Sequence, residues 1–492
     1  MNDVGFNSDE AVYSGQAATL AGHEEFSNYF SVFRAHPILF QFIVSIVYQS
    51  FGVLDVSARF ISAIFGIATV AVTYYVGKTL YNRHVGMLSA LILALLPYHI
   101  IISRQALVDV PFSFFFTLTL LFVAKFLTQD TRNNVASGAL SSFKIDRFGH
   151  GREIWLYAIG ACAGLSFLSK EVGVLTLIVA IGYLQIRHKL GARNLALILV
   201  SFIVAISPFV ISIFMEGEAA NNAFLYSQWQ LNRPPNHSYS FYPEVLVGSL
   251  GYVLMGLVIL TAGYVLVKRS AKCSGALLLF WISIPFLFFQ IWPTKGFYYM
   301  VPLIPALVIL GTSFLFSDWM KKIRYSQIVT ILLMPLIFLS TNYVIMHLVG
   351  APSNKFLAGS GGIPLGRETA QWIKENTPEG SVFMTIGPTM ANLIKFYANR
   401  DALPLSINPN PGKHNPSYTP IINPDLMIRN GQIHYIVYDM YSAARTEHFA
   451  NKLLYYADKF NAQLIHAEHS SYRNASGPAK PVTEIYVVNG VK

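Results

Sequence analysis

Two short acidic segments border long apolar runs, where an ionisable side chain is costly unless it has a partner or a task. The first contains Asp9 and Glu10, and the second contains Asp109 shortly after Arg104. A carboxylate within hydrogen-bond reach of a hydroxyl group can take its proton, which is general-base chemistry. A solvated terminus, a helix N-cap or an ion pair between Asp109 and Arg104 would explain the same residues without catalysis. The charges around them favour the catalytic interpretation.

Basic residues are few in the loops that share a side of the chain with these carboxylates. They include Arg34, His36, Arg104, Lys170 and Lys295. For any single lysine, extension of the ammonium group to the membrane interface is the simpler interpretation. Together, cations beside carboxylates at the depth of lipid headgroups suit a phosphate held at the membrane surface. The expected chemistry is transfer of a sugar from a polyprenyl phosphate, whose leaving phosphate the cations stabilise, to an acceptor hydroxyl that a carboxylate deprotonates.

The composition identifies the medium around these residues. The 492 residues are 53% hydrophobic and only 12% charged, which is about half the charge of an ordinary soluble domain. The apolar residues form runs separated by short polar stretches, the pattern of a polytopic helical membrane protein. The net charge of +10 comes largely from these short loops, so we expect it to set orientation and expect no nucleic-acid partner. Cys162 in an apolar run and Cys273 in a basic loop predict no disulfide.

The apolar runs predict ten transmembrane helices. They cover residues 58–79, 85–102, 110–127, 154–169, 172–187, 195–215, 245–267, 275–291, 298–316 and 325–348. The run 38–53 is shorter and follows His36 and Pro37, so we expect a juxtamembrane helix that lies along the interface. Residues 1–37 then form the first external loop, and residues 54–349 form the transmembrane domain.

The distribution of lysine and arginine predicts which loops lie outside. If the N-terminal segment is outside and each of the ten runs crosses once, the basic-rich loops all fall inside, as the positive-inside rule requires. A span at 38–53 would reverse every later loop. Asp9, Asp109, Lys170 and Lys295 therefore share the outer face. Because a chain that starts outside needs a means of crossing, we expect a first transmembrane helix ahead of residue 1 in the full protein.

The last 140 or so residues change character and predict a separate domain on the outer face. Residues 350–366 include a glycine cluster at 359–362, which we interpret as a linker because no strand precedes it and no Gly-Lys-Ser/Thr follows it. In residues 367–492 we expect helices at 367–376, 389–398 and 444–460 and strands at 381–386, 433–439, 462–467 and 483–488, which is an α/β unit. Asn236 and Asn474 begin glycosylation sequons on the same face.

In their order and spacing, motifs over roughly residues 7–310 resemble those of the GT-C superfamily of membrane glycosyltransferases. The similar branch contains dolichyl-phosphate-mannose protein mannosyltransferases and lipid A aminoarabinose transferases. The motifs are Asp9-Glu10 with Tyr13, His36-Pro37, Ala58-Arg59-Phe60, Arg83 to Gly86, Leu96-Pro97 followed by Ser103-Arg104 through Asp109, Leu168-Ser169-Lys170, and Lys295 with Tyr298 to Pro305.

The resemblance implies a fold and a set of roles. It implies a GT-C fold, with Asp9 as the leading catalytic carboxylate and Asp109 supporting it, and with Lys170 and Lys295 facing the lipid phosphate near Arg104. The full candidate set is Asp9, Glu10 and Asp109 for catalysis and Arg34, His36, Arg104, Lys170, Lys295 and Tyr298 for binding the donor. The family has a transmembrane helix directly before the acidic motif. His36 stands where many relatives have lysine, so phosphate binding there would depend on pH.

Several points stay open at this stage. Some branches of the superfamily require a divalent metal, and no dedicated cluster of histidines and carboxylates in the sequence forces one. A transporter or flippase for lipid-linked sugars and a non-catalytic sugar-binding membrane protein are the alternatives. Charges gathered at one face and the lack of an internal repeat argue against a transporter. We expect a multi-pass cell-membrane glycosyltransferase, mannosyltransferase-like, whose partners are the bilayer, a polyprenyl-phosphate sugar and a protein, lipid or glycan acceptor.

Overall fold

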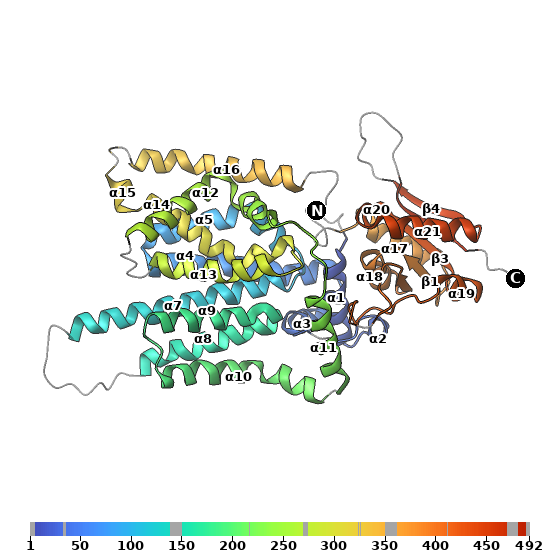
Figure 1. Ribbon diagram of the computed structural model, residues 1–492, viewed down its shortest axis with the longest axis horizontal. Coiled ribbons are helices and arrows are strands. Elements are labelled where there is room, and N and C mark those ends of the chain that lie inside the picture. Colours follow the sequence, from blue (N-terminus) through green and yellow to red (C-terminus); the bar gives the residue numbers. More distant parts are fainter. Residues whose placement is uncertain are drawn as a thin grey trace.

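The protein consists of a helical bundle joined at one end to a smaller α/β domain (Figure 1). The structure, a computed structural model, describes residues 5–32, 36–137, 150–215, 217–268, 274–322, 324, 326–349, 362–410, 412–469 and 481–488. Arg34, Cys273, Asn474 and residues 359–361 of the glycine cluster lie outside these ranges.

Three helices precede the long apolar helices. They are α1 (Ser8–Leu20), α2 (Glu24–Ser27) and α3 (Leu39–Phe51). Helix α1 begins with a capping box, in which Asn7 Oδ1 accepts a hydrogen bond from the Glu10 amide at 2.9 Å and Glu10 Oε2 accepts one from the Asn7 amide at 3.0 Å. Helix α3 coincides with the predicted juxtamembrane helix. At ~1.5 Å per residue it is about 20 Å long, too short to cross a hydrocarbon core of about 30 Å.

All ten apolar runs predicted as spans are helical. The bundle comprises α4 (Asp55–Leu80), α5 (Arg83–Leu95), α6 (Pro97–Ser103), α7 (Asp109–Ser137), α8 (His150–Ser169), η1 (Glu171–Gly173), α9 (Val174–Ile186), α10 (Ala192–Met215), α11 (Gly217–Leu231), α12 (Phe241–Lys268), α13 (Ser274–Ile291), η2 (Phe297–Leu303), α14 (Ile304–Leu315), α15 (Asp318–Lys321) and α16 (Ser326–Val349). Within the described ranges, six helices are long and apolar enough to cross a membrane, or seven if α5 and α6, which meet at 62°, form one broken span. The predicted number of ten crossings is therefore not confirmed.

Small residues allow the helices of the bundle to approach closely. A Cβ atom on Gly77 of α4 would lie only 2.8 Å from Gly86 Cα of α5, so glycine is required for this contact. Large side chains fill the wider spaces, as where the buried Trp281 of α13 meets Phe116 of α7 with ring centroids 5.0 Å apart. Close contact through small residues is a common basis of helix association in membranes.

The C-terminal domain is built on a five-stranded mixed sheet. Its elements are α17 (Gly366–Asn376), β1 (Val382–Thr385), α18 (Pro388–Leu393), η3 (Ile394–Ala398), β2 (Asp401–Pro404), α19 (Pro424–Arg429), β3 (Tyr435–Asp439), α20 (Met440–Arg445), α21 (Glu447–Lys459), β4 (Gln463–His469) and β5 (Pro481–Val487). The strand order is β2-β1-β3-β5-β4, with β1 parallel to β2 and β3 and with β5 antiparallel to β3 and β4. The predicted α/β character is correct. The sequence prediction lacked β2, α19 and α20, and its helix at 444–460 corresponds to α21.

The C-terminal domain contacts the bundle through the N-terminal helices. Figure 1 shows α1 and α3 between the long helices and this domain. Buried residues of α1, α3, α4, α17 and α18 form one continuous apolar cluster, which includes Phe6, Tyr48 and Phe383. The segment that contains α1 and α3 therefore connects the two halves of the molecule.

Candidate active site

A cavity of about 730 Å³ lies at this junction. Its walls come from α1, the beginning of α3, η1, α11, the segment between α13 and η2, and loops of the C-terminal domain. In an open α/β sheet, ligands usually bind outside the carboxyl ends of parallel strands. The loops that follow β1 and β2 are the ones that reach the cavity, at Thr389 and at Ser406 to Asn408.

Asp9, the second residue of α1, lines the cavity with its carboxylate. Its Oδ2 atom accepts a hydrogen bond of 2.7 Å from the Tyr298 hydroxyl. Burial raises the pKa of Asp9 above its usual value, although the Tyr298 hydrogen bond and the charges of Lys170 and Arg233 lower it in part. A carboxylate with a raised pKa is a stronger base than an ordinary aspartate, and it is therefore better suited to accept a proton from a hydroxyl group.

Asp109 and Lys170 form a buried ion pair beside Asp9. Lys170 Nζ lies 2.7 Å from Asp109 Oδ1, and the Asp109 side chain is only 2% exposed. The ammonium group also lies 5.3 Å from the ring centroid of Tyr298 and 4.3 Å from that of Tyr299. Lys170 lines the cavity whereas Asp109 lies behind it. The pair therefore connects the start of α7 to the tyrosine that donates a hydrogen bond to Asp9.

Lys295 is a second buried cation that lines the cavity. Its side chain is 4% exposed, and its ammonium group lies 5.2 Å from the Tyr239 ring centroid. Asn236 fixes its backbone, because the Asn236 amide accepts from the Lys295 N–H and donates to the Lys295 carbonyl, both at 2.8 Å. Across the part of the chain that the structure describes, Lys295 has no carboxylate partner. A buried, uncompensated cation is well suited to bind an anion.

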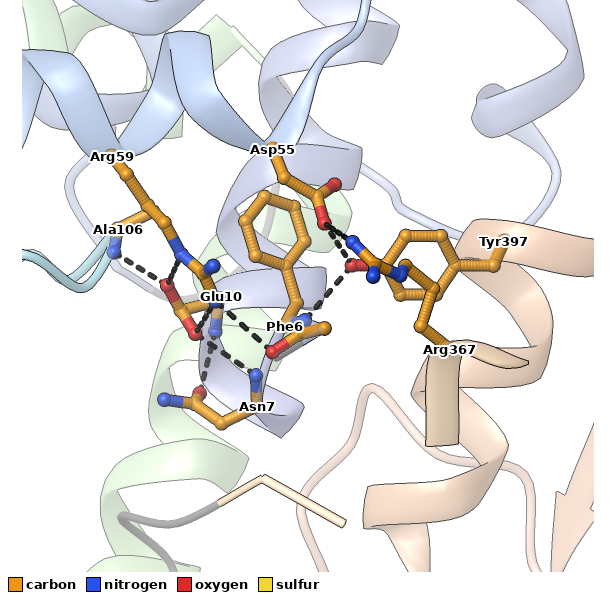
Figure 2. A network of polar contacts seen from close by, with 9 residues as sticks. Phe6, Asn7, Glu10, Asp55, Arg59, Ala106, Arg367 and Tyr397 are labelled. Carbon is orange, nitrogen blue, oxygen red and sulfur yellow. Dashed lines mark hydrogen bonds and ion pairs between the residues drawn. The ribbon is translucent and has the colours of Figure 1, made fainter. Parts of the chain in front are cut away.

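The remaining predicted residues occupy different positions. His36 lines the cavity, with its ring 5.1 Å from that of Tyr226. Arg104 is exposed and does not line the cavity. Glu10 is 2% exposed and points away from the cavity toward Arg59, with an Oε1–Nε distance of 2.9 Å (Figure 2). The geometry thus gives Glu10 a structural contact and leaves Asp9 as the carboxylate of its motif that faces the cavity.

Sequence reasoning missed several residues that line the cavity. Arg233 lies with its guanidinium carbon 4.6 Å from the Trp229 ring centroid, and Glu171 directly follows Lys170. Arg233 could have been chosen as a candidate from the sequence, because it belongs to the sparse set of basic residues in the loops that we expect outside. Glu171 could have been chosen because it lies next to Lys170. The contributions of the C-terminal domain, among them Lys413, His414, Asn415 and Tyr418, had no signal in the sequence. Across the residues that the structure covers, no group of three or more His, Cys, Asp or Glu side chains could hold a metal ion.

Solved structures with the same arrangement define the fold. ArnT from Cupriavidus metallidurans in the apo state aligns with a TM-score of 0.67 at 16% identity, over 98% of this chain and 93% of that chain. The same protein bound to undecaprenyl phosphate gives a TM-score of 0.65 at 16% identity, over the same shares. The oligosaccharyltransferase of Archaeoglobus fulgidus with Zn and sulfate gives 0.58 at 14% identity, over 98% of this chain and 69% of that chain. The chain has the GT-C fold.

A match in sequence agrees with the fold. Residues 23–232 match the family model of dolichyl-phosphate-mannose-protein mannosyltransferase. The chain is also 26% identical over 339 residues to an uncharacterized protein of Aquifex aeolicus (strain VF5), an alignment that spans 65% of this chain and 62% of that relative. These findings agree with the motifs: the chain is an integral membrane protein that has the fold of the GT-C membrane glycosyltransferases.

Proposed function

We propose that this protein transfers a sugar from a polyprenyl phosphate to an acceptor hydroxyl at the outer face of the membrane. The observation that carries the proposal is the pairing, in one cavity, of the half-buried side chain of Asp9 with the buried side chain of Lys295. A transferase of this kind needs a base for the acceptor and a cation for the leaving phosphate. The superfamily match supports the same reaction class.

The proposed reaction assigns one task to each group. The acceptor oxygen attacks the anomeric carbon of the sugar while Asp9 takes the hydroxyl proton. The bond between that carbon and the phosphate oxygen breaks, and the phosphate leaves with the electron pair. Lys295 and Arg233, which line the same cavity, stabilise the negative charge that develops on the phosphate. The products are the glycosylated acceptor and the polyprenyl phosphate.

Supporting roles fall to the residues around Asp9. The Asp109–Lys170 pair and the Tyr298 hydroxyl orient Asp9, and Lys170 adds positive charge to the cavity wall. His36 contributes a pH-dependent contact to the phosphate. Arg34 and Arg104 stay candidates for binding the donor, as the motifs imply. Glu10 acts by positioning Asp9 rather than by contacting substrate.

The class of donor is supported by a relative, and the acceptor is the least constrained part of the proposal. The ArnT structure that shares this fold contains undecaprenyl phosphate, and the family that matches residues 23–232 is described by its dolichyl-phosphate-mannose donor. We therefore propose a mannosyltransferase-like activity as the first to test. The acceptor is a protein, a lipid or a glycan.

The test is transfer of a labelled sugar by the purified protein in lipid nanodiscs. Undecaprenyl phosphates that carry mannose or aminoarabinose serve as donors, and extracts of proteins, lipids and glycans serve as acceptors. Asp9→Asn should lower turnover by at least 10²-fold, a loss typical of removing a general base, while binding of undecaprenyl phosphate persists. Lys295→Met should weaken that binding, with Asp458→Asn and Lys452→Met on the exposed face of α21 as matched controls.

The alternatives predict different results in the same assay. A transporter or flippase moves the lipid-linked sugar without forming a new glycosidic bond, and a sugar-binding protein does neither. Sugar transfer that is unchanged in Asp9→Asn would show that another group acts as the base.

A further inference from the structure

The residues just before Asp9 are held by the C-terminal domain. The Phe6 amide donates a hydrogen bond of 2.8 Å to the Tyr397 hydroxyl, which in turn donates to Asp55 Oδ2 at 2.6 Å (Figure 2). Asn392 of α18 donates one of 3.0 Å to the hydroxyl of Ser8. The C-terminal domain therefore contacts the two sides of the turn that leads into α1.

The residue just after Asp9 is held by the membrane domain. Glu10 Oε1 accepts hydrogen bonds from Arg59 Nε at 2.9 Å and from the Ala106 amide at 2.8 Å, and Arg59 Nη2 lies 3.0 Å from Glu10 Oε2. Arg59 Nη2 also donates to the Gly5 carbonyl at 3.0 Å. These bonds connect α1 to α4 and to the loop before α7, as Figure 2 shows. The backbone at Asp9 is thus fixed from both halves of the molecule.

Close packing makes the contact with the C-terminal domain rigid. A Cβ atom on Gly5 would lie 2.6 Å from Cβ of Arg367, so only glycine permits this approach. The ring of Phe6 is 1% exposed and lies 5.2 Å from that of Phe396. Arg367 extends across the same contact to Asp55, with an Nη1–Oδ2 distance of 3.9 Å. A shift of the domain would therefore move residues 5–8 with it.

The side-chain amide of Asn392 connects these contacts between residues 5–8 and the C-terminal domain to the cavity. Asn392 Nδ2 donates to the Tyr418 hydroxyl at 3.0 Å as well as to Ser8, and the Asn392 side chain is 3% exposed. Tyr418 and Ser8 both line the cavity. A bound molecule that moves Tyr418 would therefore also move Asn392, which donates a hydrogen bond to Ser8, the residue before Asp9.

We propose that the C-terminal domain positions the catalytic carboxylate, with Asn392 and Tyr397 as positioning residues that act on Asp9 through the first turn of α1. This inference rests on the proposed transferase function for its kinetic part only. A misplacement of about 1 Å in a reacting group can cost on the order of 100-fold in rate. The C-terminal domain accordingly contributes to catalysis by holding the first turn of α1 in place.

Two substitutions remove the hydrogen bonds that hold residues 5–8 and leave the apolar packing in place. Tyr397→Phe deletes the hydroxyl that joins Phe6 to Asp55, and Asn392→Leu keeps a similar volume without the hydrogen bonds. Tyr435→Phe is the matched control, because it removes a hydroxyl from the same domain while its ring stays stacked on Phe383. The double variant combines Tyr397→Phe with Asn392→Leu. Thermal unfolding of each variant in detergent shows whether it folds. If the double variant does not fold, the two single variants are measured in its place.

The first measurement is hydrogen exchange at residues 5–12 in the full-length protein, which needs no substrate. We expect the double variant to lose protection at the Phe6 and Ala11 amides by at least tenfold relative to Tyr435→Phe. Unchanged protection would overturn the proposal. If the wild-type protein transfers no sugar, the proposed function fails, and the exchange comparison alone still decides whether the domain holds α1.

The second measurement separates positioning from general loss of stability. We expect kcat of the double variant to fall on the order of tenfold or more while KM for the lipid donor changes less than twofold. Because a loosened turn exposes Asp9 to water, the acid limb of the rate profile should move to lower pH. A loss of kcat with an unmoved acid limb, or an equal loss in Tyr435→Phe, would refute the positioning role.

Discussion

The hydrogen bond from Tyr298 to Asp9 should control how the rate depends on pH. Burial raises the pKa of Asp9, and the Tyr298 hydrogen bond opposes that rise. Removal of the hydroxyl in Tyr298→Phe should therefore raise the pKa of Asp9 further. As the base must be deprotonated to act, the rate falls when pH decreases through this pKa, and the variant should lose activity at a higher pH than the wild type.

The size of the effect follows from the strength of the bond. A hydrogen bond to a charged group contributes about 1.5–3 kcal/mol, which corresponds to roughly a ten- to hundredfold change in the deprotonated fraction on the acid limb. At pH well above the limb, Asp9 is deprotonated in both proteins and kcat/KM should differ much less. The loss of activity in Tyr298→Phe should therefore be confined largely to acidic pH.

The assay is kcat/KM for sugar transfer between pH 5 and pH 9 in nanodiscs. Tyr252→Phe is the control, since Tyr252 lies on α12 and is 64% exposed on the outer surface of the bundle. An acid limb that stays in place in Tyr298→Phe, or moves to lower pH, would refute the assignment of Asp9 as the base. A uniform loss at every pH would show that Tyr298 contacts substrate instead.

Two further predictions concern stability. Burial raises the pKa of Asp439 to about 6, and its Oδ2 atom has no hydrogen-bond partner among the residues that the structure describes. Because the folded-state pKa exceeds the unfolded one, the free energy of unfolding should fall as pH rises from about 4 through about 6, by up to ~3 kcal/mol. Asp439→Asn keeps the N-cap of α20 and should raise the melting temperature more at pH 8 than at pH 5, and an equal change at both would contradict the assignment. Gly77→Ala should destabilise the bundle by about 1–3 kcal/mol through its clash with Gly86, whereas Gly263→Ala, with open space around it, should not; thermal unfolding in detergent compares the two.

The sequence predicted the helical bundle well because apolar runs of spanning length allow few other structures. It also selected Asp9, Asp109, Lys170, Lys295 and Tyr298, which the structure brings into one region. Charge in an apolar setting is a strong signal, and these residues come from loops that the charge distribution places on one side.

Two features of the site could not be predicted in this way. Neighbouring residues on a helix point about 100° apart, so the sequence alone could not tell that Asp9 faces the cavity while Glu10 faces Arg59. The contribution of Asn392 and Tyr418 depends on how the C-terminal domain docks. Their residue types are ordinary for a soluble domain, and no periodic pattern marks a contact between separate folds.

The bend between α5 and α6 sets how far the loop between α6 and α7 extends beyond α5 along the axis of that helix. Helix α6 has seven residues and turns by 62° at Leu96 and Pro97, so its rise along α5 is about 5 Å instead of about 10 Å. The loop that follows carries the Ala106 amide and Asp109. A spanning segment adapts its tilt and kink to the thickness of the bilayer, so a thicker bilayer would favour opening this bend and would move that loop away from α1. We expect turnover to have an optimum in lipid chain length, so the thickness of the membrane acts as a constraint on catalysis.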